Sequence, residues 1–177
     1  MFSFLQPDKA FITVNDKVWL SKTAKWNACV KMAQANPACV FIAWFEKTKD
    51  ELELYFNEHG VQAQLVLAQD ISEATPEVMY ICIEHHPLQN QEQKLFAKLK
   101  LTEAPVLSSM DEPLFSLFGG ERLIHTMERL GIGEDEIVGH SMISSAIRKG
   151  QKKMEKKVRF EKPAVSQQEW FDLNMSN

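Results

Sequence analysis

The residues most able to bind a metal ion stand together at Glu84, His85 and His86. Carboxylate and imidazole groups are common protein ligands of Zn²⁺. These three residues follow the apolar run 78–83, which predicts a buried strand, so they mark its end. Neighbouring side chains of an extended chain point to opposite faces, so three in a row rarely converge on one ion. We therefore treat them as weak metal candidates and expect a strand end at the surface.

Other catalytic patterns are absent from the sequence. The three cysteines, Cys29, Cys39 and Cys82, include no C-x-x-C pair and lie within apolar runs, which predicts buried thiols in a reducing compartment. No serine lies in a G-x-S-x-G elbow. The phosphate-binding pattern G-x-x-x-x-G-K-[ST] does not occur either. We expect no catalytic residue and no cofactor.

Positive charge gathers in residues 148–162, although the whole chain has a net charge of −4. Ile143, Ile147 and Met154 recur at helical spacing, which predicts an amphipathic helix with its basic residues opposite an apolar stripe. The basic residues have three interpretations: a solvated face, a docking surface for an acidic protein, or a site for nucleic acid or anionic lipid. The candidate partner-binding residues are Arg148, Lys149, Lys152, Lys153, Lys156 and Lys157.

The elements that would position these residues follow from the hydrophobic pattern. Strands are predicted at 39–45, 61–67, 78–83 and 105–107, and helices at 22–35, 48–60, 88–101, 111–118, 120–130 and 141–158. Strands joined by helices through short links imply parallel crossovers. We expect an α/β fold with an open, mainly parallel sheet flanked by helices, followed by a C-terminal helical extension.

Local signals add three details. Residues 11–20 alternate around Asn15-Asp16, which predicts a short hairpin. Thr48 and Glu51 have the spacing of a capping box, and Gly60 is placed to end that helix in a left-handed turn.

The chain divides into three predicted parts. Residues 1–138 form the α/β domain, residues 139–160 the basic helix, and residues 161–177 a mobile tail with Trp170-Phe171 as its one anchor. The start of the chain, MFSFLQPDKA, has no basic region followed by a long apolar run, so it does not resemble a signal peptide. No apolar run approaches the roughly 20 residues of a membrane span, and we expect a cytoplasmic protein.

Several longer segments carry a family resemblance. They are SMDEPLFSLFGGER at 109–122, MERLG at 127–131, HSMIS at 140–144 and QKKME at 151–155. Together they resemble SecA, the ATPase motor of bacterial preprotein translocation, where its second nucleotide-binding fold leads into the long scaffold helix. A weaker likeness extends over residues 11–158. The resemblance implies a RecA-like second motor fold, the root of a helix and a link to protein export.

The same resemblance implies that the motor chemistry is missing. In SecA the phosphate loop belongs to the first motor fold, and the second fold contributes arginines from a Q-L-R-G-R-x-G-R-Q-G-D segment. This chain has QEQKLFAKLKL at 91–101 and QDISEATPE at 69–77, where the family has its glycines and arginines. Lysine does not reproduce the planar fork of arginine, so we predict no ATP hydrolysis.

Three functions remain open from the sequence. The first is a non-catalytic SecA-like module that binds a protein partner, with a translocase component among the candidates. The second is a regulatory subunit that binds a nucleotide or another anion in the degenerate cleft. The third is a module that binds nucleic acid or anionic lipid through the basic helix, although only Phe160 is nearby for base stacking.

Overall fold

A single parallel sheet organises the molecule. The computed structural model describes residues 11–117, 119–139 and 141–175, so the N-terminal MFSFLQPDKA and His140 lie outside the described residues. Within these ranges the sheet has five strands in the order β1-β5-β4-β2-β3, and every pairing is parallel. The strands are β1 (Thr13–Trp19), β2 (Cys39–Ala43), β3 (Gln64–Leu67), β4 (Met79–Cys82) and β5 (Glu103–Ser109). The predicted α/β class is confirmed.

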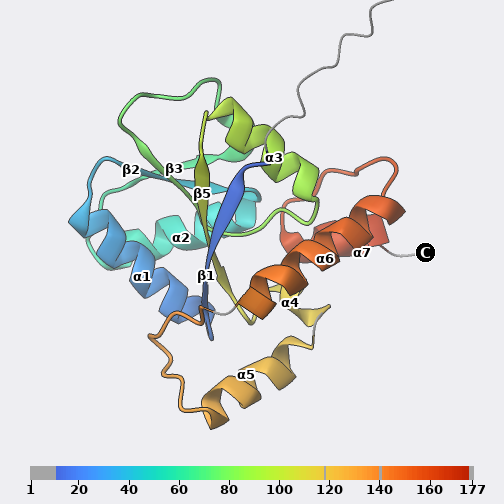
Figure 1. Cartoon of the computed structure of the whole chain (residues 1–177). Coiled ribbons are helices and arrows are strands. Elements are labelled where there is room, and N and C mark those ends of the chain that lie inside the picture. The colour runs from blue at the N-terminus through green and yellow to red at the C-terminus, as the bar shows by residue number, and fades with distance from the viewer. Residues whose placement is uncertain (1–10, 118, 140, 176–177) are drawn as a thin grey trace, which may run out of the picture.

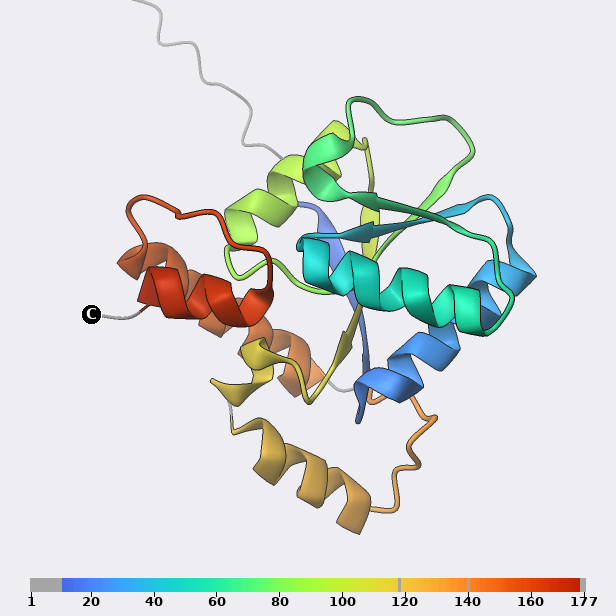
Figure 2. The same ribbon diagram turned by 180° about the vertical axis from the view of Figure 1, so that it is seen from behind.

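Helices cover both faces of this sheet (Figure 1). They are α1 (Lys22–Ala35), α2 (Glu46–Glu58), α3 (Gln89–Lys98), α4 (Pro113–Ser116), α5 (Gly120–Arg129), α6 (Ser141–Lys157) and α7 (Gln167–Met175), with a 3-10 turn η1 at Ala68–Asp70. Seen from behind, α2 crosses in front of the sheet, and α7 lies beside it (Figure 2).

The central strands are buried on both sides. Phe41 of β2 packs in the cluster formed with α1 and α2, whereas its neighbours Val40 and Ile42 pack with α3. Phe41 and Ile42 have no exposed surface. An uninterrupted apolar run is therefore what this strand requires, as expected for a parallel strand covered by helices on both faces.

The predicted hairpin at residues 11–20 is wrong. Thr13–Trp19 is one strand that pairs in parallel with β5 along its whole length. A two-residue hairpin turn needs residues with positive φ, and Asn15 and Asp16 are not among the described residues that have it. The extended strand instead brings the Asp16 carboxylate to His85, which follows β4.

The predicted capping box is also wrong, although the helix exists. Helix α2 begins at Glu46, two residues before Thr48, and Phe45 at its N-cap makes no side-chain cap bond. Glu51 forms an ion pair with Lys22 at 2.8 Å instead of reaching back to Thr48. The predicted end is right, since Gly60 follows the helix with a φ of 63°.

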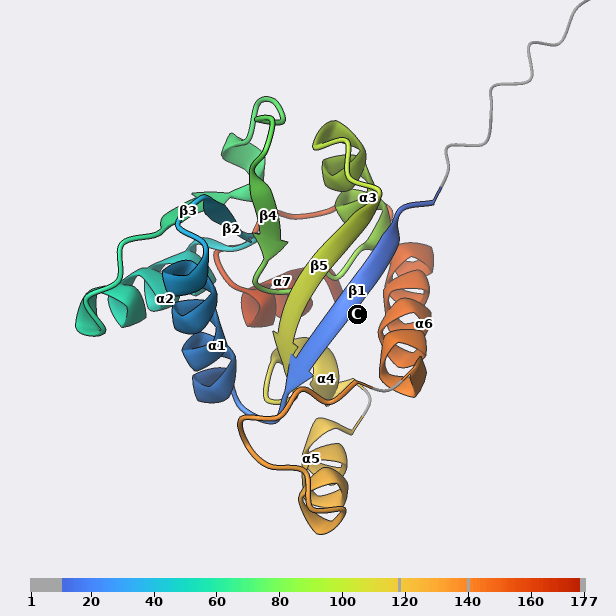
Figure 3. The same ribbon diagram turned by 60° about the vertical axis from the view of Figure 1, so that its left-hand side comes forward.

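The C-terminal part of the chain forms a third apolar cluster. Ile143, Ile147 and Met154 of α6 pack there with Leu114 of α4 and with Trp170 of α7. Helix α6 lies alongside the edge strand β1, and α5 stands away from the sheet beyond the ends of β1 and β5 (Figure 3).

The expected mobile tail from residue 161 is corrected by this cluster. The segment contains helix α7, and Trp170 within it is 1% exposed. In the part of the chain that the structure describes, no helix combines the length and apolar character needed to cross a membrane.

Candidate functional site

The carboxyl edge of the sheet carries the candidate site. In open parallel α/β sheets, ligands bind in crevices outside the carboxyl ends of the strands. Here Trp44 and Phe45 follow β2, Ala68 and Gln69 follow β3, and the residues 84–86 follow β4.

The three weak metal candidates are buried at this edge. Glu84, His85 and His86 are 3%, 1% and 7% exposed, so the expectation of a surface strand end is wrong. The physical reason is that the C-terminal helices cover them, which the sequence prediction of a mobile tail did not anticipate. Gln151 of α6 donates to the backbone oxygen of His86 at 2.8 Å, and Gln167 of α7 donates to that of His85 at 3.0 Å.

Glu84 binds the backbone of the two residues that lead into α2. Its Oε1 accepts hydrogen bonds from the backbone N–H groups of Trp44 and Phe45, at 3.0 and 3.1 Å, and its Oε2 accepts one from the Thr48 hydroxyl at 2.7 Å. Burial raises the pKa of Glu84 to about 7, and the Thr48 hydrogen bond opposes that rise only in part. A carboxylate at a helix N-terminus satisfies free backbone donors, so its role here is structural.

His85 lies between two carboxylates. Its Nδ1 lies 2.8 Å from Oε1 of Glu92 on α3, and its Nε2 lies 2.9 Å from Oδ1 of Asp16 on β1. Burial lowers the pKa of His85, but Glu92 and Asp16 together outweigh it and raise the pKa to about 10. His85 is therefore an imidazolium that ties α3 and the edge strand β1 to the end of β4.

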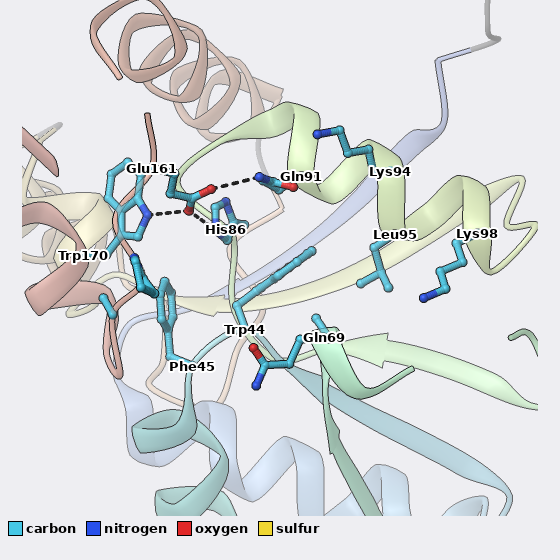
Figure 4. Close-up of a pocket in the computed structure, with 13 residues that line it drawn as sticks. Trp44, Phe45, Gln69, His86, Gln91, Lys94, Leu95, Lys98, Glu161 and Trp170 are labelled. Carbon is cyan, nitrogen blue, oxygen red and sulfur yellow. Dashed lines mark hydrogen bonds and ion pairs between the residues drawn. The ribbon is translucent and has the colours of Figure 1, made fainter. Parts of the chain in front are cut away.

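His86 takes a third direction, toward the connection between α6 and α7. Its Nδ1 accepts from the backbone N–H of Leu88 at 3.0 Å, which leaves the proton on Nε2, and Nε2 lies 3.0 Å from Oε1 of Glu161. The indole N–H of Trp170 donates to the same oxygen at 2.7 Å, and the Gln91 amide donates to Oε2 at 2.9 Å (Figure 4).

The Glu161 carboxylate is consequently held as an anion. Burial raises the pKa of Glu161, but the hydrogen bonds from His86 and Trp170 reverse this effect and lower the pKa to about 2.

The three adjacent side chains thus reach three separate sets of partners, as the strand geometry predicted. Among the residues that the structure describes, no group of three His, Cys, Asp or Glu side chains is placed to hold a metal ion. The three cysteines are free thiols and buried, which confirms the prediction of burial.

A buried ion pair completes the carboxyl edge. Lys25 of α1 forms an ion pair with Glu112, the residue that precedes α4, and their side chains are 1% and 6% exposed. Lys25 also donates to the backbone oxygen of Ile83 at 2.7 Å, and Glu112 accepts from the backbone N–H of Ser109 at 3.0 Å. This pair could not be predicted from local sequence patterns, because its members lie 87 residues apart.

A cavity of about 450 Å³ opens beside this network, and we call it the edge pocket. It lies between the ends of β2 and β3, helix α3 and the connection from α6 to α7 (Figure 4). It is lined by Trp44, Phe45, Ala68, Gln69, His86, Gln91, Lys94, Leu95, Lys98, Glu161, Pro163, Ala164 and Trp170. Of these lining residues, only His86 is a candidate site residue predicted from the sequence, and it is predicted there as a metal ligand.

The candidate partner-binding residues lie on α6 as predicted. Ile143, Ile147, Gly150 and Met154 are buried, which confirms the apolar stripe. On the other side of the helix, Arg148 is half-buried, whereas five lysines are exposed: Lys149, Lys152, Lys153, Lys156 and Lys157. We call these five lysines the basic face.

Comparison with known proteins gives local matches to SecA proteins. The chain is 31% identical over 103 residues to the protein translocase subunit SecA of Christiangramia forsetii, which is 56% of this chain and 9% of that protein. It is 42% identical over 53 residues to SecA of Chlorobium phaeovibrioides and 45% identical over 47 residues to SecA of Cytophaga hutchinsonii. Segments of this chain are similar to SecA.

These matches are partial on both sides. The second and third cover 30% and 27% of this chain but only 5% and 4% of the SecA proteins. The chain therefore spans less than a tenth of the length of the SecA relatives that it matches. No protein-family model matches the chain.

Proposed function

We propose that this chain is a non-catalytic module, derived from the second motor fold of SecA, that binds a protein partner in protein export. The local similarity to SecA supports the link to export. The absence of catalysis and the protein partner rest on the chemistry of the carboxyl edge and of α6.

The observation that carries the proposal is the closure of the carboxyl edge by the chain's own C-terminal helices. Gln151 and Gln167 bind the backbone of His85 and His86, and the ionisable side chains beneath them are paired with one another. The residues that follow β2, β3 and β4, at 44–45, 68–78 and 83–88, include no arginine. Phosphoryl transfer relies on cations placed to stabilise charge on the transferred group, whereas Lys25 and His85 at this edge are each paired with carboxylates.

The basic face supports a protein partner with acidic character. Its five lysines are exposed over two turns or more of one packed helix, so their positions are fixed by the apolar stripe beneath. Fixed, like-charged groups attract an acidic surface and raise the rate of encounter with it.

A direct binding measurement tests the proposal. Purified chain is immobilised, and purified SecA is passed over it at two salt concentrations, because exposed charges are screened over about 8 Å at physiological ionic strength. Replacing Lys152, Lys153, Lys156 and Lys157 by Glu should abolish binding. Lys31→Glu, a reversal of an exposed lysine on α1, is the matched control and should leave binding unchanged.

Binding of the same variants to duplex DNA and to anionic vesicles tests the two other functions of the basic face. Loss of retention on duplex DNA or on vesicles of anionic lipid, with SecA unbound throughout, would replace the protein partner by nucleic acid or lipid. Unchanged behaviour of the fourfold variant toward SecA, DNA and vesicles would leave the basic face as a solvated surface and contradict the proposal.

A further inference from the structure

We infer that the edge pocket is a peptide site, which takes an acidic segment of the partner through one apolar or aromatic anchor side chain. This inference rests on the proposed function and deepens it, because it names a second contact surface and the chemistry that the surface recognises. The basic face plays no part in it, so the two contacts can be tested separately.

The inner wall of the pocket is apolar. Phe45, Leu95 and Ala68 are buried, and the half-buried Trp44 presents its ring to the cavity between them (Figure 4). Trp44 is held edge-on against His86, with ring centroids 4.9 Å apart. A cavity of about 450 Å³ lies in the usual range for small ligand sites, roughly 300–1,000 Å³.

The Glu161 wall is held in place by its partners and stays negative, so the carboxylates of the segment must lie toward the lysines of the opposite wall. Its carboxylate is already bonded by His86, Trp170 and Gln91, so three donors share its charge. Its side chain is 25% exposed, in contrast to the exposed lysines on the opposite wall.

The opposite wall is cationic. Lys94 and Lys98 lie one turn apart on α3 and both line the pocket. Both are exposed, and Lys98 donates to the backbone oxygen of Ile71, the residue after η1. An ammonium group has three donors, so Lys98 retains the capacity to bind a carboxylate.

The apolar wall and the two lysines together indicate which kind of peptide the pocket binds. A hydrophobic wall favours burial of an apolar side chain, and two lysines at the opening favour carboxylates on either side of that anchor. Interfaces commonly work in this way, with a buried aromatic anchor surrounded by a charged rim. A partner that docks on the basic face must be acidic as well, so one acidic protein can satisfy both surfaces.

Short labelled peptides test the inference on the intact chain. The probe has one phenylalanine between glutamates, and two matched peptides replace the phenylalanine by alanine or the glutamates by lysines. Fluorescence anisotropy reports binding, and a change in tryptophan emission that is lost in Trp44→Phe reports contact with Trp44. We expect the alanine and lysine peptides to bind about tenfold or more weakly than the probe.

Variants locate the site. Lys94→Glu combined with Lys98→Glu should weaken probe binding about tenfold, because both charges at the opening are reversed. Gln69→Trp, at an exposed lining position, should block the probe by filling the pocket. Lys31→Glu should change the affinity less than twofold, since α1 does not line the pocket.

Three results would overturn the inference: equal binding of the probe and its alanine form, equal binding by the Lys94/Lys98 and Lys31 variants, or displacement of the probe by ATP with stronger binding of the nucleotide. If SecA still binds through the basic face in any of these cases, the proposed function stands without this peptide site. If the probe binds while SecA does not, the site stands and the identity of the partner is wrong.

Discussion

Replacing Trp170 by alanine should destabilise the whole domain. Trp170 is 1% exposed, and its indole N–H donates to Glu161 at 2.7 Å. Its ring meets that of His86 edge-on at 6.0 Å and that of Phe171 at 5.3 Å. These contacts hold α7 and the α6–α7 connection against the end of β4. Their loss should therefore destabilise more of the domain than α7 alone.

The magnitude follows from burial. A tryptophan buries about 150–250 Å², which at about 25 cal/mol per Å² corresponds to roughly 4–6 kcal/mol of transfer free energy. Measured aromatic-to-alanine changes in cores cost about 3–5 kcal/mol, since the surroundings relax in part. For a chain of this size each kcal/mol lowers Tm by roughly 2–4 °C, so we expect a decrease of roughly 6–20 °C.

Thermal unfolding followed by circular dichroism measures the decrease in Tm, and urea unfolding measures the loss of unfolding free energy. Leu173→Ala is the matched control on the same helix, because Leu173 is 40% exposed and its loss should cost about 0.5 kcal/mol or less. If Trp170→Ala and Leu173→Ala have equally small effects, α7 is not packed on the domain. The closure of the carboxyl edge would then be refuted.

Four further outcomes are expected. His85 has its pKa raised from 6.5 to about 10 in the folded state, so its stabilising contribution is complete below pH 6.5 and is lost as the pH rises toward 10; His85→Gln should remove this slope from urea unfolding measured across that range. Lys25→Met leaves Glu112 buried without its partner and should cost about 3–5 kcal/mol in unfolding, whereas adding Glu112→Leu should recover most of that loss. Ile147→Ala should cost about 2–5 kcal/mol, since Ile147 is 1% exposed, and Lys152→Ala should change stability by less than about 0.5 kcal/mol in the same assay. Purified chain should release no phosphate from ATP above a boiled control, with or without unfolded preprotein, and steady release that depends on the chain would contradict this.

Most helices and strands could be predicted from the sequence because the patterns that indicate them involve residues close together in the chain. The apolar run at 39–45 and the helical spacing at 22–35 depend on residues that are neighbours in sequence, and both elements form where the pattern places them. Errors occurred where a distant residue replaced a local partner. The Thr48 hydroxyl donates to the distant Glu84 instead of capping α2, and pairing with β5 keeps Asn15-Asp16 extended.

Most of the candidate site could not be predicted, because its residues come from elements that are far apart in the sequence. His85 and Glu92 are close in sequence, but Asp16 reaches them from β1 and Gln167 covers them from α7. Lysines 94 and 98 carry no sequence signal for a pocket, since its other walls come from β2, β3 and the residues after α6. The basic face could be predicted because basic and apolar residues recur at helical spacing on opposite sides of one helix.

Affinity capture from a native lysate, with quantitative mass spectrometry at low and moderate salt, tests the central claim most directly. The wild-type chain and the Lys31→Glu control should both enrich a translocase component, and the variant with Lys152, Lys153, Lys156 and Lys157 replaced by Glu should not. Enrichment that is equal for all three chains, or no enrichment of any translocase protein at either salt concentration, would contradict a SecA-derived module that binds its partner through the basic face.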